Sequence, residues 1–239
     1  MRKVYLGLSA MLFLFLWNAP NASAQCPAVC DFDINMDFQN VNMTGNQTAC
    51  FSADVSDVFF NFGGSDNTIC VPAGVTWTQN FGGTFSNVTI EVYGTVIVPG
   101  EMTFNNTTVI NVYNGGVFET SSTIAGPITV NNAGTWNYLP GANGQVGGQN
   151  NTVFNNLTGG VFDATALTNQ FLFIGPVAVT NFGTMNFSSI ENNEADVFDN
   201  YGEINISRYF FNHGNLYNYG DVNTACGMFG AGACEFIVG

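Results

Sequence analysis

Short segments of the chain alternate between apolar and polar residues. The alternation is clearest in Val88–Val92, Thr95–Val98, Thr108–Val112 and Gly183–Phe187, which are rich in valine, isoleucine, threonine and phenylalanine. A period of two residues predicts strands that bury one face. Beyond the first 24 residues no segment has the periodicity of an amphipathic helix, so the sequence predicts an all-β protein.

The pattern repeats at a nearly constant interval. An Asn-aromatic-Gly tripeptide begins at Asn181, Asn200 and Asn218. Ile206 and Asn212 divide the second interval into equal thirds, so three short sides would make one coil of about 18 residues. Repeats of this length are typical of solenoids, in which each repeat packs against its neighbours.

One strand followed by a glycine turn cannot bury its apolar face alone, whereas stacked coils share a continuous core. The sequence therefore predicts a single-stranded, parallel, right-handed β-helix (a β-solenoid) with about 18–20 residues per coil. We expect glycine to supply a positive φ at each corner and asparagine amides to form ladders between coils. A β-sandwich, the alternative, does not repeat one tripeptide at a fixed interval. The predicted coil corners are Gly94, Gly116, Gly134, Gly160, Gly183, Gly202, Gly214, Gly220, Asn181, Asn200, Asn212 and Asn218.

The repeats divide the chain into segments. We expect a disulfide-rich cap with the first strands at 25–70, the repeat array at 71–223 and a second disulfide cap at 224–239. Near 139–150 the interval is broken by a proline and several glycines, which predict a protruding loop. The loop lacks the Gly-Lys-Ser/Thr ending of a phosphate-binding loop, so no nucleotide site is expected there.

The first 24 residues have the organisation of a signal peptide. Arg2 and Lys3 precede an apolar run, and Ala-Ser-Ala at residues 22–24 supplies a small-x-small cleavage site. The apolar run is too short for a comfortable membrane span, and no second candidate follows. We therefore predict an exported chain that begins at Gln25 and has no transmembrane segment after cleavage.

Composition and charge narrow the classes of function. Only 8% of the residues are charged, whereas 46% are hydrophobic and 14% are aromatic, which argues against disorder and against a coiled coil. Arg208 would be the one basic residue after cleavage, beside 17 acidic residues in the sequence. A chain with one cation cannot neutralise phosphates, so nucleic acid is excluded as a partner.

The six cysteines lie near the two ends of the chain, and their even number in an exported protein predicts three disulfides. Cys226 and Cys234 are isolated from the rest and are expected to pair with each other, while the connectivity of the other four stays open. A zinc site would need a second CxxC or a companion histidine, and the sequence has neither. The four N-terminal cysteines are Cys26, Cys30, Cys50 and Cys70.

Ile69-Cys-Val-Pro-Ala-Gly-Val-Thr, Asn87-Val-Thr-Ile-Glu-Val-Tyr-Gly-Thr and the Asn-x-Gly coils that follow are similar to a known group of sequences. They resemble the exported β-helical repeat proteins of Bacteroidetes. The resemblance covers about residues 68–223. It implies a cell-surface or adhesin-like protein.

Catalytic residues are not expected. A glycosidase needs two carboxylates at a fixed separation, and no residue of the densest acidic group matches a known catalytic signature. The pectinases combine a histidine with paired aspartates and an Arg-x-Lys motif, which do not accompany His213. Asn212-His-Gly instead matches Asn200-Tyr-Gly, which predicts that His213 lies at a coil corner. The acidic group consists of Glu191, Glu194, Asp196 and Asp199.

One segment resembles a calcium-binding loop in its spacing. Asp31, Asp33, Asn35 and Asp37 place oxygens at positions 1, 3, 5 and 7 of an EF-hand-like loop, but the glycine at position 6 and the glutamate at position 12 are missing. We favour a half-buried strand instead, with Phe32, Ile34, Met36 and Phe38 inward, because this alternation explains every residue. The segment is a weak calcium candidate, and no metal is expected.

Aromatic residues are the candidates for a ligand surface. A carbohydrate-binding module would use exposed rings. Ice binding would need Thr-x-Thr repeated at the coil interval, and Thr76-Trp-Thr78 occurs once. The candidate ligand surface consists of Trp77, Trp136 and Tyr138, with further tyrosines at 201, 209, 217 and 219 on or near the coil corners.

The sequence thus favours an exported, non-catalytic structural or adhesive β-solenoid at the cell surface or in the extracellular matrix. Its partner would be a surface protein or a polysaccharide, and no cofactor is implied. Capping disulfides are expected to block edge-to-edge growth, with head-to-tail self-association as the alternative. The alternative functions are a carbohydrate-binding module that uses the aromatic corners and a polysaccharide-active enzyme near residues 191–199.

Overall fold

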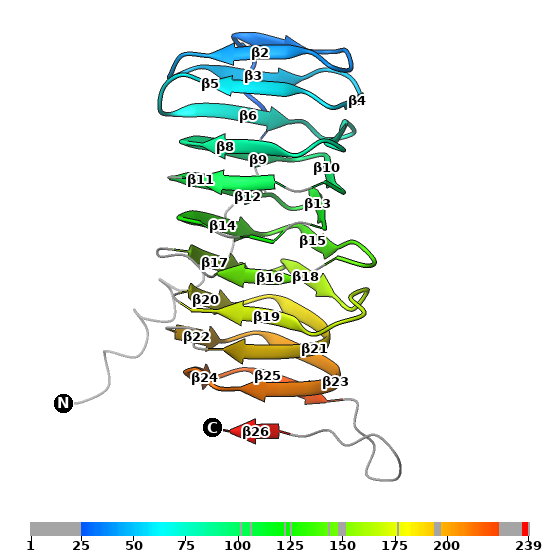
Figure 1. Ribbon diagram of the computed structural model, residues 1–239, viewed down its shortest axis with the longest axis vertical. Helices are drawn as coiled ribbons and strands as arrows, with labels where there is room; N and C mark the ends of the chain where they lie inside the picture. Colours follow the sequence, from blue (N-terminus) through cyan, green and yellow to red (C-terminus); the bar gives the residue numbers. More distant parts are fainter. Residues whose placement is uncertain are drawn as a thin grey trace, which may run out of the picture.

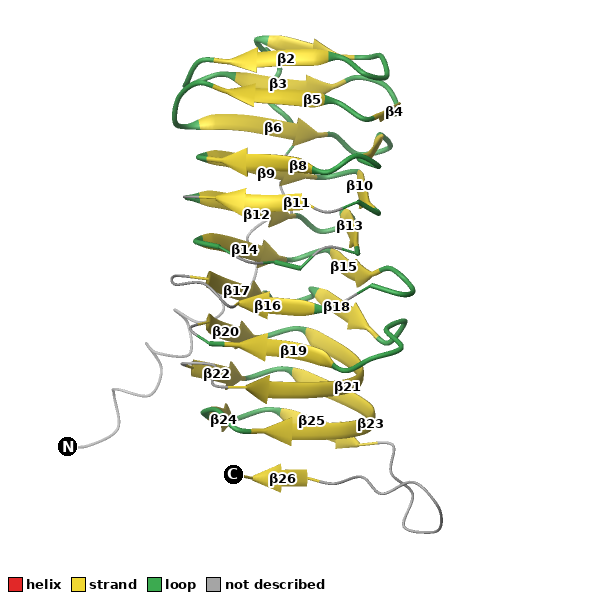
Figure 2. Ribbon diagram, in the orientation of Figure 1, coloured by secondary structure: helices red, strands yellow, loops and turns green. Residues whose placement is uncertain are grey.

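The computed structural model describes residues 25–100, 102–105, 107–121, 123–124, 126–142, 144–147, 152–175, 177–193, 197–224 and 236–238. These residues form 26 strands and no helix (Figure 2). All the strand pairs are parallel, and Figure 1 shows the coils stacked along one long axis. The prediction of an all-β parallel solenoid is confirmed.

Each coil runs through three faces. The first face is a ten-stranded sheet, so the chain makes nine turns between its first and last strands. Its strands are β1 (Phe32–Ile34), β3 (Thr48–Phe51), β6 (Asn67–Val71), β9 (Val88–Val92), β12 (Thr108–Val112), β14 (Ile128–Asn132), β17 (Thr152–Asn156), β20 (Val177–Asn181), β22 (Val197–Asn200) and β24 (Leu216–Asn218).

The second and third faces merge near the C-terminal end, because β21 and β23 are long enough to turn the corner between them. The second face holds β4 (Val55–Ser56), β7 (Thr76–Thr78), β10 (Thr95–Val98), β13 (Val117–Thr120), β15 (Thr135–Tyr138), β18 (Val161–Ala164), the first halves of β21 (Thr184–Asn193) and β23 (Glu203–Asn212), and β25 (Asp221–Thr224). The third face holds β2 (Asn40–Met43), β5 (Phe59–Phe62), β8 (Gly83–Ser86), β11 (Met102–Asn105), β16 (Gln145–Gly147), β19 (Phe171–Ile174), the second halves of β21 and β23, and β26 (Phe236–Val238).

The coils differ in length more than the sequence suggested. Ile90 pairs with Ile110, an interval that matches the predicted coil length. Val130 pairs with Phe154 and Phe154 with Val179, so these two coils are longer than predicted. The predicted loop at 139–150 accounts for part of the excess, but it also contains strand β16. The irregular part described between β15 and β16 is therefore shorter than predicted.

Inward side chains stack into a continuous apolar core. On the second face, the inward column places Phe118 on Trp136, with ring centroids 4.2 Å apart. Phe187 and Phe198 are buried at inward positions of β21 and β22. Phe182 lies at a coil corner instead, stacked on Tyr201. Inward side chains thus form the core, and corner rings stack outside it.

A ladder of buried asparagines runs along the corner between the first and second faces. Its members, each bonded to the next through side-chain amides at 2.6–2.8 Å, are Asn132, Asn156, Asn181, Asn200 and Asn218. The first four are fully buried. A buried amide is costly unless it is hydrogen-bonded, and each coil here supplies the partner for the next. The predicted amide ladder is confirmed.

The corner glycines have a different role from the one expected. None of those predicted at the coil corners has a positive φ among the described residues; that conformation occurs one residue earlier, at Gly115 and Gly159. A Cβ on Gly202 would lie 2.1 Å from the carbonyl oxygen of Gly183, and one on Gly220 would lie 2.1 Å from that of Gly202. Glycine is required because successive corners touch through their backbones, and the prediction of a positive φ was wrong.

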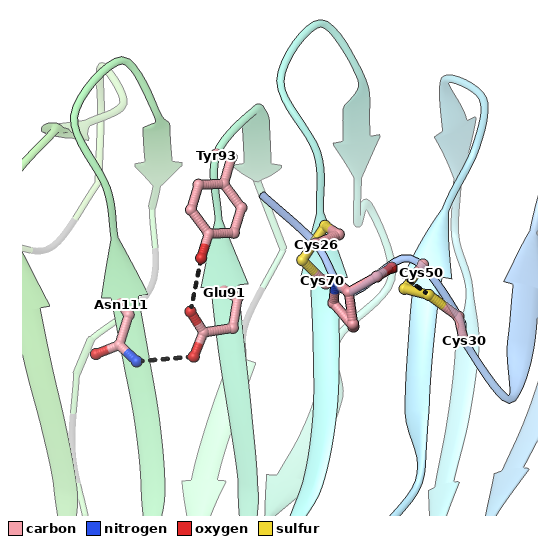
Figure 3. The surroundings of a disulfide bond; sticks show 8 residues. Cys26, Cys30, Cys50, Cys70, Glu91, Tyr93 and Asn111 are labelled. Atoms are coloured by element: carbon pink, nitrogen blue, oxygen red, sulfur yellow. Dashed lines mark hydrogen bonds between the residues drawn. A yellow bond between two sulfur atoms is a disulfide. The ribbon is translucent and has the colours of Figure 1, made fainter. Parts of the chain in front are cut away.

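Two disulfides fix the N-terminal coils. Cys26 is bonded to Cys70 and Cys30 to Cys50, which settles the open connectivity (Figure 3). Cys50 and Cys70 are neighbours in the register of β3 and β6, at outward positions that are nevertheless buried. The bridges thus attach the segment before β1 to the outer side of the first face. Strand β1 itself pairs with β3 and is part of the first coil. The predicted Cys226–Cys234 bridge lies outside the described residues.

Removing one of these bridges is expected to destabilise the protein. Cys30–Cys50 spans 20 residues, and closing a loop of that length stabilises the folded state by about 3 kcal/mol. The variant Cys30→Ser/Cys50→Ser should lose about this much free energy of unfolding in urea, while Cys26–Cys70 stays intact. An unchanged urea midpoint would show that the N-terminal coils do not need the bridge.

Candidate functional site

Among the described residues, large apolar side chains are exposed in two groups, one in the first three coils and one in the last four. None of them lies between residues 82 and 156, in the middle coils. Near the first coils they are Val29, Met36, Phe38, Phe59 and Phe81; near the last coils they are Leu157, Phe182, Val197, Tyr201, Tyr209, Tyr217 and Tyr219. Scattered exposure is normal on a protein surface, whereas exposure confined to particular regions indicates contact surfaces.

Three of the C-terminal rings form what we call the aromatic column. Phe182, Tyr201 and Tyr219 each precede a corner glycine, so the parallel register places them directly above one another. Neighbouring ring centroids are 4.9 Å apart and the rings are tilted by 10°. The side chains are 47%, 46% and 65% exposed. The column presents ring edges and two phenol hydroxyls to solvent, a composition typical of protein interfaces.

A polar column lies beside it on the outer second face. Asn186, Asn205 and Asn223, the outer amide column, continue the position of Asp163 on successive strands. Asn205 donates to the oxygen of Asn186 at 3.0 Å, and Asn223 donates to that of Asn205 at 3.0 Å. A cavity of about 300 Å³ follows this column. Thr165, Ser207 and the buried side chains Phe187 and Ile206 also line it.

The candidate ligand surface of Trp77, Trp136 and Tyr138 is corrected by the structure. These side chains are 0%, 0% and 2% exposed, because they occupy inward positions of β7 and β15. Burial also raises the pKa of the Tyr138 phenol above its ordinary value. They belong to the core and cannot contact a ligand at the surface. The tyrosines at 201, 209, 217 and 219 are the exposed ones.

The carboxylates of the weak calcium candidate accept hydrogen bonds from the next coil instead. The Asp31 carboxylate accepts the backbone N–H of Thr48 at 2.7 Å, and that of Asp37 accepts the N–H of Ser56 at 2.6 Å. Asp33 bonds to the side chains of Asn35 and Ser52. Among the described residues no group of three or more His, Cys, Asp or Glu side chains is placed to hold a metal ion.

The competing strand at residues 32–38 is only partly confirmed. Ile34 is buried and Phe32 is packed against the core. Met36 and Phe38 were expected inward but are exposed, because β1 ends at Ile34 and Phe38 takes a φ of 57° in the following turn. Phe38 instead packs near Phe59 and Phe81 at the corner of the first coils.

The acidic group at 191–199 does not form a carboxylate pair in its described part. Glu191 lies on β21 of the twelve-stranded sheet and accepts a hydrogen bond from Gln170, whereas Asp199 lies on β22 of the ten-stranded sheet. Glu194 and Asp196 are outside the described residues. His213 occupies a coil corner, where its backbone N–H donates to the backbone carbonyl of Asn192 at 2.8 Å. This agrees with the corner predicted for it.

Comparisons of the chain with the models of known protein families, with curated proteins and with solved structures found no match. In the described part of the chain, no helix has the length and apolar character needed to cross a membrane. The function therefore has to be inferred from the surface of the solenoid itself.

Proposed function

We propose that the protein is an exported, non-catalytic structural and adhesive module, which acts at the cell surface or in the extracellular matrix and contacts a partner protein through the aromatic column. The observation that carries the proposal is the stack of three exposed aromatic rings, Phe182, Tyr201 and Tyr219, on one corner of the last coils. Exposed tyrosines grouped on one corner suit a protein interface, in which aromatic residues supply most of the binding energy.

Export is supported by the disulfides and by the leader-like sequence. Cys26–Cys70 and Cys30–Cys50 are bonds that persist in oxidising compartments. A rigid rod also suits a structural role, because the core and the buried amide ladder continue through the coils without a domain boundary.

The C-terminal end is the better adhesive candidate of the two. The aromatic side chains of the first coils lie in a segment that carries six aspartates between residues 31 and 66 and no cation. Such a field repels the acidic surfaces of other proteins and cells. Residues 197–224 carry three acidic residues and Arg208, so the aromatic column lies in a weaker field.

Bead adhesion tests the proposed function. Beads coated with residues 25–239 are expected to adhere under flow to at least one of collagen, fibrinogen and fibronectin, more strongly than albumin-coated beads do. The same protein is expected to release no reducing ends or unsaturated products from a panel of polysaccharides, because Glu191 and Asp199 lie on different sheets. Adhesion at the albumin level on all three proteins would refute the adhesive role, and turnover of a polysaccharide would refute the non-catalytic one.

A further inference from the structure

We propose that the outer amide column and its cavity bind a neutral, hydroxyl-rich polysaccharide chain that lies along the axis of the solenoid. This site is separate from the aromatic column and goes beyond the proposed adhesive role. It consists of Asn186, Asn205 and Asn223 with Asp163, and of the side chains that line the cavity beside them.

The column offers the same hydrogen-bonding group on each successive coil. An amide has two N–H donors and an oxygen with two lone pairs. Within the ladder Asn205 uses one N–H toward Asn186 and one lone pair toward Asn223, which leaves one donor and one acceptor for a ligand. Coils repeat at the strand spacing of about 4.8 Å. A periodic array of paired donors and acceptors fits a ligand that is itself periodic and rich in hydroxyl groups.

The cavity beside the outer amide column lets a ligand enter the surface instead of lying flat on it. Its volume of about 300 Å³ is at the lower end of the range for ligand sites, large enough for a few sugar units and too small for a folded domain. Thr165 and Ser207 supply hydroxyls beside the amides, whereas Phe187 and Ile206 are buried beneath the cavity and offer the ligand no side-chain surface. The polar groups that reach the cavity are therefore amides, hydroxyls and one carboxylate, which complement the hydroxyl-bearing edges of a sugar chain.

Charge selects a neutral ligand. Asp163 is the one ionisable side chain in the lining, and its carboxylate is held by the N–H and the hydroxyl of Thr165 at 2.8 and 2.6 Å. Glu203 adds a second carboxylate next to the column through its bond to Asn223. No basic side chain lines the cavity. Phosphates, sulfates and uronates are repelled, whereas the hydroxyls of a neutral glycan can donate to these oxygens.

The aromatic column is poorly suited to stack against a sugar ring, whereas the outer amide column is open to hydrogen bonding. Sugar stacking requires an open ring face, and the faces of Tyr201 are covered by Phe182 on one side and by Tyr219 on the other. The exposed part of the Tyr201 ring is therefore its edge. The expectation that a sugar lies across the aromatic corners is therefore replaced by a site on the adjacent face.

Affinity electrophoresis in gels that contain a soluble polysaccharide tests the inference. The neutral probes are dextran, laminarin and galactomannan, and the acidic probes are alginate and polygalacturonate. The wild-type chain is expected to be retarded by at least one neutral probe and by neither acidic one. Asn205→Ala is expected to weaken the retarding interaction about tenfold, equivalent to about 1.4 kcal/mol. Ser207→Trp, at an exposed position, is expected to fill the cavity and abolish it.

Asn131→Ala is the matched control. Asn131 belongs to a similar outer ladder on the first face, bonded to Asn111 and Asn155 at 2.9 Å each, so its loss removes the same ladder contacts away from the proposed site. Its binding is expected to equal that of the wild type. Equal losses in Asn131→Ala and Asn205→Ala, stronger binding of the acidic probes, or no retardation by any neutral probe would overturn the inference.

The two proposals can fail separately. Retardation by a neutral probe without bead adhesion to protein would support the polysaccharide site and refute the adhesive role. Bead adhesion that persists in Ser207→Trp, with no retardation of the wild type, would leave the adhesive role intact and refute the polysaccharide site.

Discussion

Replacing Phe162 with alanine is expected to lower the free energy of unfolding by about 3–5 kcal/mol. Phe162 is fully buried at the centre of the aromatic interior of the C-terminal half. Its ring lies 5.1 Å from that of Phe171, 5.2 Å from that of Phe154 and 5.5 Å from that of Phe187. Truncation leaves a cavity whose walls belong to three neighbouring strands, and the hydrogen-bonded coils around it cannot collapse to fill the space.

Phe182→Ala is the control for this prediction. The same kind of ring is removed, but Phe182 is 47% exposed and belongs to the aromatic column at the corner. The loss should be about 1 kcal/mol or less. Both values are measured by urea unfolding with the disulfides intact. Equal losses at the two positions would mean that the inward and corner assignments are wrong.

Asn181→Ala is expected to cost about 2–4 kcal/mol, because it interrupts the buried amide ladder and removes the partner of the Asn200 oxygen and of the Gly183 backbone N–H. The amide of Asn181 accepts from Asn156 at 2.8 Å and donates to Asn200 at 2.7 Å. Asn156 keeps its bonds to the carbonyls of Gly160 and Thr184, whereas the oxygen of the fully buried Asn200 loses a hydrogen bond that water cannot replace. An unsatisfied buried polar group costs about 1–3 kcal/mol.

The outer ladder again provides the comparison. Asn131 makes two bonds of the same kind on the half-buried surface of the first face, where water can take the place of the missing amide. Asn131→Ala should therefore change the free energy of unfolding by about 0.5 kcal/mol or less. If both variants lost the same amount, burial would not be what makes the inner ladder important.

The fold was predictable because a short motif, Asn-aromatic-Gly, recurs at the same corner of successive coils. The asparagine of Asn-aromatic-Gly becomes a ladder residue, the aromatic becomes a corner residue and the glycine becomes a backbone contact, as Asn200, Tyr201 and Gly202 show. The sequence could not reveal the reason for the glycine, because a positive φ and a missing Cβ select the same residue. The close approach of Gly202 to the Gly183 carbonyl exists only once the coils are stacked.

The surface was less predictable than the core. The alternation in Thr76-Trp77-Thr78 contains the signal that buries Trp77, because the middle residue of a three-residue strand faces the opposite side from its neighbours. The outer amide column left a fainter signal, an asparagine two positions into each of the last three second-face strands. Asn186 and Asn205 lie a full coil apart in the sequence, and only the pairing register brings them together. The cavity beside them depends on the corner geometry of β21 and β23, which no local pattern encodes.

The adhesion of two matched triple variants tests the central claim most directly. Phe182→Ser/Tyr201→Ser/Tyr219→Ser removes the aromatic column, and Phe38→Ser/Phe59→Ser/Phe81→Ser removes an equal number of exposed rings at the other end. Measured under flow on the matrix protein that retains wild-type beads, the first variant is expected to lose adhesion and the second to keep it. Full adhesion without the aromatic column, or loss only in the second variant, would contradict the account.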